Sequence, residues 1–379
     1  MRILIAAGVT ANREAGTASA VYNVADGLRA LGHHVDCLLA DDLLPRPVLL
    51  PRFTDLYMAF RLARTILQRR GFYDVVNVHT HIGFAYGLLR KFRGGRDLPP
   101  LVVTLHGVLE RVGHAMRREA AKGRAEHFRW KNRIWHNLYH MPIYRLAVTT
   151  AQHVMIVNRE GLSVFQLTHG LDADRVWYVP NGVEPRFLSE REYPGGRALR
   201  LLFVGTWLDR KGIYYLRDAF EALAARNHGL SLTVAGCLTE PERIKEWFSV
   251  PARDGVSVIP FVPREKMPAL YAEHDIFVFP SLVEGMPLVL LEAMAAGMPV
   301  VTTETCGMAD VVEDEQNGLL VKPADAAAFA DAVERLIESP ELRVRLGRAA
   351  QETMRRYTWS AIAQRVEKIF TLAITAKRG

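Results

Sequence analysis

The stretch SLVEGMPLVLLEAMAAGMPVV, residues 281–301, has the pattern of a loop, a helix and the start of a strand. Pro287 stands at the expected beginning of a helix over residues 287–298, where its fixed φ angle and its missing N–H group do no harm. The loop before it exposes backbone N–H groups at the positive end of that helix, and Gly285 allows a ligand to approach the backbone closely. The pattern predicts an anion site, and phosphate is its expected occupant.

Short apolar runs alternate with helical patterns on both sides of this stretch. Several runs are apolar without alternation, which is typical of parallel strands covered on both faces by helices. The sequence therefore predicts an α/β fold with two Rossmann-like, doubly wound domains. The expected strands are 2–7, 74–79, 101–106, 153–158 and 176–180 in the first domain, and 199–205, 230–236, 256–262, 275–280 and 299–303 in the second.

The segment NGVEPRFLSEREYPGGRA, residues 181–198, is rich in glycine, proline and charge, and we expect it to link the domains. The first domain then covers residues 1–185 and the second covers residues 186–355. Residues 340–376 have helical spacing and no strand pattern. Their last part either caps the second domain or returns to the first.

The composition favours a globular protein in a reducing compartment. The chain has 379 residues, of which 49% are apolar and 23% charged, so two packed domains fit and extensive disorder is disfavoured. The cysteines are odd in number and far apart, which argues against a disulfide framework and predicts a cytoplasmic location. No uncharged apolar run reaches the roughly 18–20 residues that a membrane-spanning helix needs. Residues 1–11 have the pattern of a first strand and a glycine turn rather than of a secretory leader.

Two glutamates accompany the predicted anion site. Glu284 in the loop and Glu292 in the helix can both face the carboxyl ends of the strands, where open α/β sheets bind ligands. Carboxylates suit the hydroxyl groups of a sugar or a ribose, although two glutamates at this spacing are also common on solvated surfaces. Glu292 is the only charge in an apolar helix that we expect to be buried, and a buried charge needs a partner.

Basic residues follow another strand in VGTWLDRKG, residues 204–212. The strand is expected to close at Gly205, and Arg210 and Lys211 precede the next helix. Cations at this end of a helix oppose its dipole unless an anion such as a diphosphate joins them. An exposed basic turn is the alternative explanation. His106 ends the strand 101–106 and is placed for a cleft, although a histidine bonded to the backbone is the commoner case.

The positive charge lies in the first half of the chain. Residues 1–190 hold 25 Lys and Arg against 16 Asp and Glu, a net +9, and residues 191–379 hold 23 against 25, a net −2. Within residues 110–146, nine basic residues accompany three glutamates, and an apolar stripe recurs at helical spacing at Trp130, Ile134, Leu138 and Met141. This stripe either lies in an anionic membrane surface or packs on the domain. We expect no nucleic-acid partner, since no zinc-finger spacing or RNP-type string is present.

Three strings resemble the retaining nucleotide-sugar glycosyltransferases of family 4, also called glycosyltransferase group 1. They are VPNGVE, VGTWLDRKG and PSLVEGMPLVLLEAMAAGMPVV, and the resemblance extends over nearly the whole chain, most specifically over residues 200–320. The resemblance implies a GT-B fold, in which two Rossmann-like domains face each other across a cleft. It also implies that the terminal helix, residues 356–379, packs back on the first domain.

The resemblance implies roles for particular residues. Lys211 and Arg210 would hold the donor diphosphate, and Glu292 would bind the ribose hydroxyls. His106 would line the sugar and acceptor side. The remaining donor-binding positions are Glu284 with the backbone of Gly285, Met286, Pro287 and Leu288, together with Gly205, and Gly16 would leave room beside the phosphate.

No metal or other cofactor is expected. Asp172 and Asp174 match the D-x-D pattern that binds Mg²⁺ or Mn²⁺ in some transferases, but they precede the strand 176–180, where relatives carry polar turn residues. A zinc ion shared by His79 and His81 is not expected either.

The expected activity is transfer of a hexose-type sugar from a nucleoside diphosphate to a saccharide or lipid-linked saccharide, as in bacterial-type surface polysaccharide or glycolipid synthesis. The resemblance implies retention at the anomeric carbon by front-face substitution, with Glu284 as nucleophile a minor alternative. The chain departs from the family at Thr206, where relatives carry an arginine that contacts the diphosphate. A catalytically impaired sugar-nucleotide-binding protein is therefore an alternative. A nucleotide-sugar epimerase or phosphorylase on the same fold is an alternative enzyme.

Overall fold

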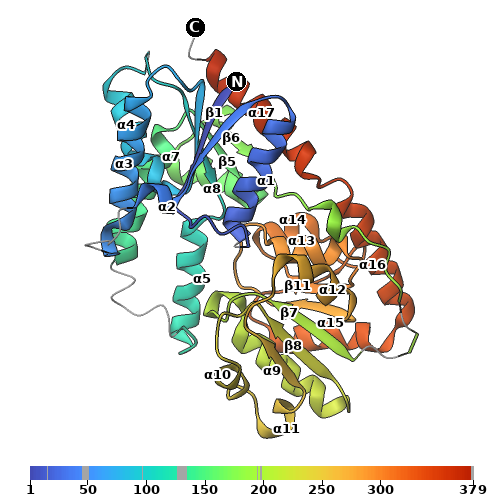
Figure 1. Ribbon diagram of the computed structural model, residues 1–379. Coiled ribbons are helices and arrows are strands. Elements are labelled where there is room, and N and C mark those ends of the chain that lie inside the picture. The colour runs from blue at the N-terminus through green and yellow to red at the C-terminus, as the bar shows by residue number, and fades with distance from the viewer. Residues whose placement is uncertain are drawn as a thin grey trace. The chain divides into compact units, whose positions relative to one another are not determined.

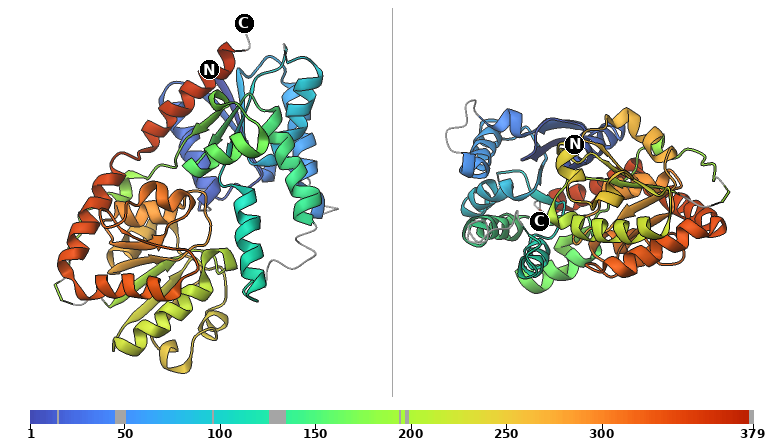
Figure 2. Two further views of the ribbon diagram at one scale, coloured as in Figure 1. Left: turned by 180° about the vertical axis from the view of Figure 1, so that it is seen from behind. Right: turned by 90° about the horizontal axis from the view of Figure 1, so that it is seen from below.

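The computed structural model describes residues 1–14, 16–44, 51–95, 97–125, 135–193, 195–196 and 199–376 (Figure 1). Its contacts divide the chain into two units. The first unit contains the described parts of residues 1–109, 130–182 and 359–379, and the second contains those of residues 110–129 and 183–358. Each unit contains a six-stranded parallel sheet with helices on both faces (Figure 2), so the predicted fold class is confirmed.

The first unit has the strand order β2-β1-β3-β4-β5-β6. Its strands are β1 (Arg2–Ala7), β2 (His34–Leu38), β3 (Val75–His79), β4 (Leu101–Leu105), β5 (His153–Ile156) and β6 (Val176–Tyr178). Its helices are α1 (Gly16–Ala30), α2 (Ala40–Leu43), η1 (Pro51–Phe53), α3 (Thr54–Gln68), η2 (His81–Gly83), α4 (Phe84–Phe92), η3 (His136–His140), α7 (Met141–Thr150), α8 (Arg159–His169), η4 (Ala173–Arg175) and α17 (Trp359–Thr375).

The second unit has the strand order β12-β11-β10-β7-β8-β9. Its strands are β7 (Arg200–Val204), β8 (Ser231–Ala235), β9 (Val256–Ile259), β10 (Ile276–Phe279), β11 (Val300–Thr303) and β12 (Leu319–Val321). Its helices are α5 (Leu109–Ala121), η5 (Pro185–Phe187), η6 (Asp209–Lys211), α9 (Ile213–Arg226), α10 (Pro241–Lys245), α11 (Val250–Arg253), η7 (Arg264–Lys266), α12 (Met267–Ala272), α13 (Leu288–Ala295), α14 (Cys306–Val311), α15 (Ala326–Glu338) and α16 (Pro340–Met354).

Burial explains why the central strands are apolar without alternation. Both β3 and β4 are buried along their whole length, as are β10 and β11 in the second sheet. Helices begin and end where the side chains dictate. The Asn158 side chain accepts a hydrogen bond from the Gly161 N–H at the start of α8, and Gly170 ends that helix with a φ angle of 64°.

The helical region at the end of the chain is divided between the units. Helix α16 belongs to the second unit, whereas α17 packs along α1 of the first unit (Figures 1 and 2). Residues 110–125, which the sequence placed with the first half, have their contacts in the second unit.

Candidate functional site

The strand order of the second unit reverses between β7 and β10. Strands β8 and β9 continue the sheet on the side of β7, and β11 and β12 continue it on the side of β10. Parallel sheets of this type bind ligands in the crevice beyond the carboxyl ends of the two strands where the order reverses. The loops that leave these ends are 205–212 and 280–287, which are the two segments that the sequence analysis singled out.

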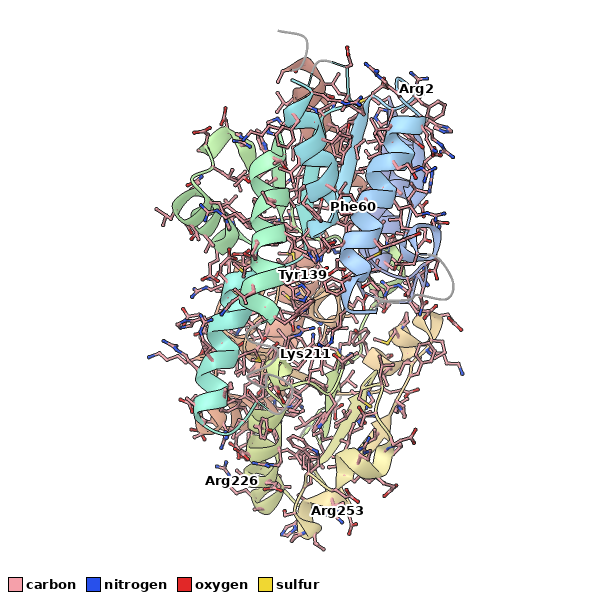
Figure 3. All side chains as sticks on the ribbon, turned by 90° about the vertical axis from the view of Figure 1, so that its left-hand side faces the viewer. Arg2, Phe60, Tyr139, Lys211, Arg226 and Arg253 are labelled. Atoms are coloured by element: carbon pink, nitrogen blue, oxygen red, sulfur yellow. The ribbon has the colours of Figure 1, made fainter. Side chains whose placement is uncertain are left out.

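Three of the predicted charges meet in this crevice. Glu284 Oε1 lies 2.7 Å from Arg210 Nη1, 2.7 Å from Lys211 Nζ and 3.0 Å from the Ser281 hydroxyl, which also lies 3.0 Å from the carbonyl oxygen of Arg210. Lys211 is buried beneath the loop, with its stem against Gly205 and its ammonium group 5.1 Å from the centre of the Phe279 ring. Figure 3 shows Lys211 at one end of α9 and Arg226 at the other.

The electrostatics of this cluster favour a charged Glu284. Burial alone would raise the pKa of the Glu284 carboxyl, but Lys211 and Arg210 hold it below its usual value. The anion expected beside Arg210 and Lys211 is therefore the Glu284 carboxylate. A phosphate that approaches these two cations meets side chains that are already positioned around a negative charge.

A glycine brings the two loops together. Gly212 has a φ angle of 73°, and a Cβ atom on it would lie 1.9 Å from the carbonyl oxygen of Pro280, so no other residue fits. The Leu282 N–H donates to the carbonyl oxygen of Arg210 at 2.8 Å, which joins the same loops from the other side. Backbone contacts between the two loops thus determine how Arg210 and Lys211 lie against Glu284.

Helix α13 begins one residue later than predicted and ends earlier. Pro287 is its N-cap rather than its first helical residue, and the helix covers Leu288–Ala295 because Gly297 turns the chain with a φ angle of 69°. Gly285 lies against Gly307, where a Cβ atom would approach the Gly285 carbonyl oxygen to 1.9 Å. This contact with α14 holds the backbone of residues 285–288 at the start of the helix.

Glu292 has the partner that its burial requires. Its Oε1 lies 2.8 Å from Arg264 Nη2, and the Tyr271 hydroxyl donates to its Oε2 at 3.0 Å. Arg264 Nε also donates to Glu184 Oε1 at 2.6 Å. Burial raises the pKa of Glu292, although Arg264 opposes this effect. No sequence pattern pointed to Arg264 or Tyr271. The lone charge in an apolar helix indicated that a partner existed, but not where it lay.

The predicted residues of the first unit lie at the carboxyl ends of its strands. Gly16 is the first residue of α1, and apart from its chain neighbours and the backbone of its own helix, no described heavy atom lies within 4 Å of the place of its Cβ. His106 follows β4, and its Nε2 lies 2.8 Å from His79 Nδ1. His79 Nε2 lies 3.0 Å from Asn77 Oδ1, and Asn77 Nδ2 donates to the Thr104 hydroxyl at 2.8 Å. No sequence pattern pointed to His79 and Asn77 as the partners of His106.

Two family models match the chain. One described as glycosyl transferases group 1 matches residues 191–353, and one described as glycosyltransferase family 4 matches residues 15–187. A D-inositol 3-phosphate glycosyltransferase from Saccharomonospora viridis is 30% identical over 336 residues, which are 82% of this chain and 73% of the relative. The chain belongs to the group 1 glycosyltransferases. It spans about half the length of two other curated relatives that it matches.

Solved structures of glycosyltransferases share the fold. Sucrose-phosphate synthase from Thermosynechococcus elongatus has a TM-score of 0.78 at 18% identity, covering 99% of this chain and 100% of that one. HepE from Anabaena, solved in complex with UDP and glucose, has a TM-score of 0.69 at 19% identity, covering 98% and 99%. The GT-B fold class that the motifs implied is thus confirmed for this glycosyltransferase.

The basic segment of the glycosyltransferase, residues 110–146, falls into two described pieces. Trp130 and Ile134 of its predicted apolar stripe lie outside the described residues, and Leu138 is 76% exposed. In the first piece, Met116 of α5 packs against Tyr215 and Leu282 of the second unit, so this apolar side is covered by protein. Among the described helices, none combines the length and the apolar character that crossing a lipid bilayer requires.

Proposed function

We propose that this glycosyltransferase transfers a sugar from a nucleoside diphosphate sugar to a saccharide or lipid-linked saccharide, with retention at the anomeric carbon. The observation that carries the proposal is the convergence of Arg210 and Lys211 at the reversal point of the second sheet, beside the start of α13. Two cations and a helix N-terminus are suited to a diphosphate. The reaction is placed in the cytoplasm, at the membrane face when the acceptor is lipid-linked.

The proposed chemistry depends on stabilising the leaving diphosphate. Negative charge develops on it as the bond to the sugar breaks, and fixed cations aimed at that charge lower the barrier without reorganising. Arg210 and Lys211 supply these cations, so the proposed reaction needs no metal ion. The donor phosphate accepts the proton of the attacking hydroxyl on the same face of the sugar.

Glu284 is a poor choice of nucleophile in this proposal. Its Oε1 already accepts from Arg210 and Lys211, and its lowered pKa reflects a carboxylate whose electrons are held by cations. We assign Glu284 to the donor sugar and to the positioning of the two cations. Glu292, held by Arg264 and Tyr271, is assigned to the ribose hydroxyls, and His106 to the sugar.

Thr206 favours one second candidate, a protein that binds a sugar nucleotide without turning it over. Relatives place an arginine there, and this chain does not. Arg210 compensates in part for the arginine that is missing at position 206. Its guanidinium group contacts the same Glu284 oxygen as the Lys211 ammonium group, and an arginine side chain can reach a phosphate from more than one direction.

The test is nucleotide binding by calorimetry. UDP leads a panel of nucleoside diphosphates and their sugars, because the structure of HepE contains UDP. K211Q should weaken binding of the preferred nucleotide by about tenfold or more, since a charge-assisted hydrogen bond contributes roughly 1.5–3 kcal/mol. R226A removes a half-exposed cation from the far end of α9 and should bind like the wild type.

Two results decide between the candidates. Release of the nucleoside diphosphate when acceptor saccharides are added supports the transferase, and tight binding without release supports the binding protein. Equal nucleotide affinity of K211Q and R226A, with both variants folded by circular dichroism, would show that the crevice at β7 and β10 is not the donor site. The anomeric configuration of the product, read by NMR, tests retention separately.

A further inference from the structure

Three side chains of the first unit converge away from the residues discussed so far. His81 Nε2 lies 2.9 Å from Asp55 Oδ2, and His140 Nδ1 lies 3.8 Å from the same oxygen. One ligand atom from each residue lies within 4.8 Å of the other two, and within the described part of the chain no other three such residues meet this condition. In a tetrahedral zinc site with bonds of about 2.0–2.1 Å, neighbouring ligand atoms lie roughly 3.3 Å apart, which small side-chain rotations reach from these positions.

The three residues come from separate elements, and two of them have an uncommon local structure. Asp55 is in the first turn of α3, and His81 begins η2 directly after Thr80, whose φ angle of 75° is rare for a β-branched residue. His140 ends η3, a π-helical turn in which the Met141 N–H donates to the His136 carbonyl oxygen. Single π-helical turns and strained residues both occur preferentially at functional sites.

Aromatic packing holds η3 beside α3. The Trp135 and Tyr139 rings stack with their centres 4.4 Å apart, and the Phe53 ring meets both edge-on at 5.4 and 5.9 Å. Tyr139, labelled in Figure 3, directly precedes His140. The packed rings therefore hold Asp55 of α3 beside His140 of η3, so this contact is not a chance encounter of flexible side chains.

The proposed site is accessible from the solvent. The three side chains are 21–32% exposed, which leaves room for an ion to enter and to keep a water ligand.

We propose that Asp55, His81 and His140 form a binding site for a divalent transition-metal ion, with Zn²⁺ as its best fit. Two imidazole nitrogens and one carboxylate oxygen favour zinc and its neighbours over Mg²⁺ and Ca²⁺, which prefer oxygen alone. The three protein ligands leave a fourth position open for water or another ligand. The bound ion links three elements: the start of α3, the turn that follows β3, and η3. The site is independent of the cations assigned to the donor diphosphate.

Zinc titration of the chelator-treated, re-dialysed full chain tests the proposal. Calorimetry should find one Zn²⁺ per chain, and zinc should raise the melting temperature. D55N and H140Q should each lower the zinc affinity at least about tenfold, a minimum set by the 10–100-fold that even indirect metal contacts contribute. Cobalt(II) offers a second readout, because its visible absorption reports ligation by nitrogen and oxygen.

H34Q is the matched control. His34 Nε2 also lies near a carboxylate, 3.4 Å from Asp36 Oδ1, but it does not belong to the group of three and its side chain is 60% exposed. H34Q should bind zinc like the wild type. Zinc binding that H140Q and D55N leave unchanged would show that ordinary surface histidines bind the ion, and the proposal would then be wrong, as it would if the wild type bound no zinc. Melting curves without metal show whether each variant is folded.

Discussion

The hydrogen-bond donors behind His106 determine which of its nitrogens carries the proton. Asn77 donates both amide hydrogens, to the carbonyl oxygen of Val102 and to the Thr104 hydroxyl, so its Oδ1 must accept from His79 Nε2. His79 then has a lone pair on Nδ1, and His106 must donate to it from Nε2. The Nδ1 atom of His106 is left as an acceptor, which is the form that a sugar hydroxyl can donate to.

This arrangement predicts a loss of stability in mild acid. Burial lowers the pKa of His106 from 6.5 to about 4, and lowers that of His79 as well. Between pH 6.5 and about pH 4, His106 is protonated in the unfolded chain but not in the folded chain. Acid therefore favours unfolding, and His106 lowers the free energy of unfolding by at most about 3 kcal/mol. Denaturant unfolding of the first unit at pH 6.5, 6.0, 5.5 and 5.0 should show stability falling with pH.

The H106Q variant tests the assignment. Burial also lowers the pKa of His140 and His153 in the first unit, so H106Q should reduce the pH slope rather than abolish it. H34Q, which removes an exposed histidine, should keep the wild-type slope. A slope unchanged in H106Q would mean that the buried histidine pair does not stay neutral.

Single residues also show how much of the candidate site could be predicted from the sequence. Lys211, Arg210 and Glu284 were predicted from motifs, and the structure brings them together at one oxygen atom. The partner of Glu292 was inferred to exist from the cost of burying a charge. The sequence could not show that this partner is Arg264. Arg264 and Glu292 belong to different elements, and only folding brings Arg264 Nη2 to 2.8 Å from Glu292 Oε1.

At the scale of elements, the inner strands were predictable, whereas two of the four edge strands were missed. Every strand predicted from an apolar run exists, with ends within a few residues. The missed strands, β2 and β12, each lie at one edge of their sheet, and the strands at the opposite edges, β6 and β9, were predicted. Strand β2 reads HVDCL, and only Val35 in it is buried, so it lacks the continuous apolar run that identified the others.

The close packing of α1 against α17 predicts that a larger side chain at their contact lowers the stability of the first unit. A Cβ atom on Gly27 would lie 2.7 Å from that of Ala363, so only glycine allows these helices to lie this close. G27L should separate them and lower the stability of the first unit by about 1–3 kcal/mol, the usual cost of overpacking, as measured by denaturant unfolding. D26L adds the same side chain at a neighbouring, half-exposed position and should cost less than 1 kcal/mol. Equal effects of both variants would contradict the close packing.

At the scale of the whole molecule, the chain passes between the units four times, and the passages at residues 182–183 and 358–359 lie side by side. The Val183 N–H donates to the Tyr357 carbonyl oxygen at 2.7 Å. A Cβ atom on Gly182 would lie 2.8 Å from the Trp359 backbone nitrogen, so glycine is required where the second passage enters the first unit. The predicted linker, residues 181–198, contained only the first of these passages, since nothing in the helical pattern of 340–376 marked the other.

This connectivity predicts that the end of the chain stabilises its beginning. A chain that stops after Thr358 lacks α17, which buries Trp359, Ile362, Val366, Ile369 and Phe370 in the first unit. At about 1.5–3 kcal/mol for each large apolar side chain, the loss matches or exceeds the roughly 5–15 kcal/mol that hold a domain folded. Hydrogen exchange should therefore show lost protection in β1–β6 and retained protection in β7–β12, whereas a chain that stops after Ala376 should keep both. Equal loss in the two sheets would mean that the units fold as one, and full protection in both would mean that α17 contributes little to the first core.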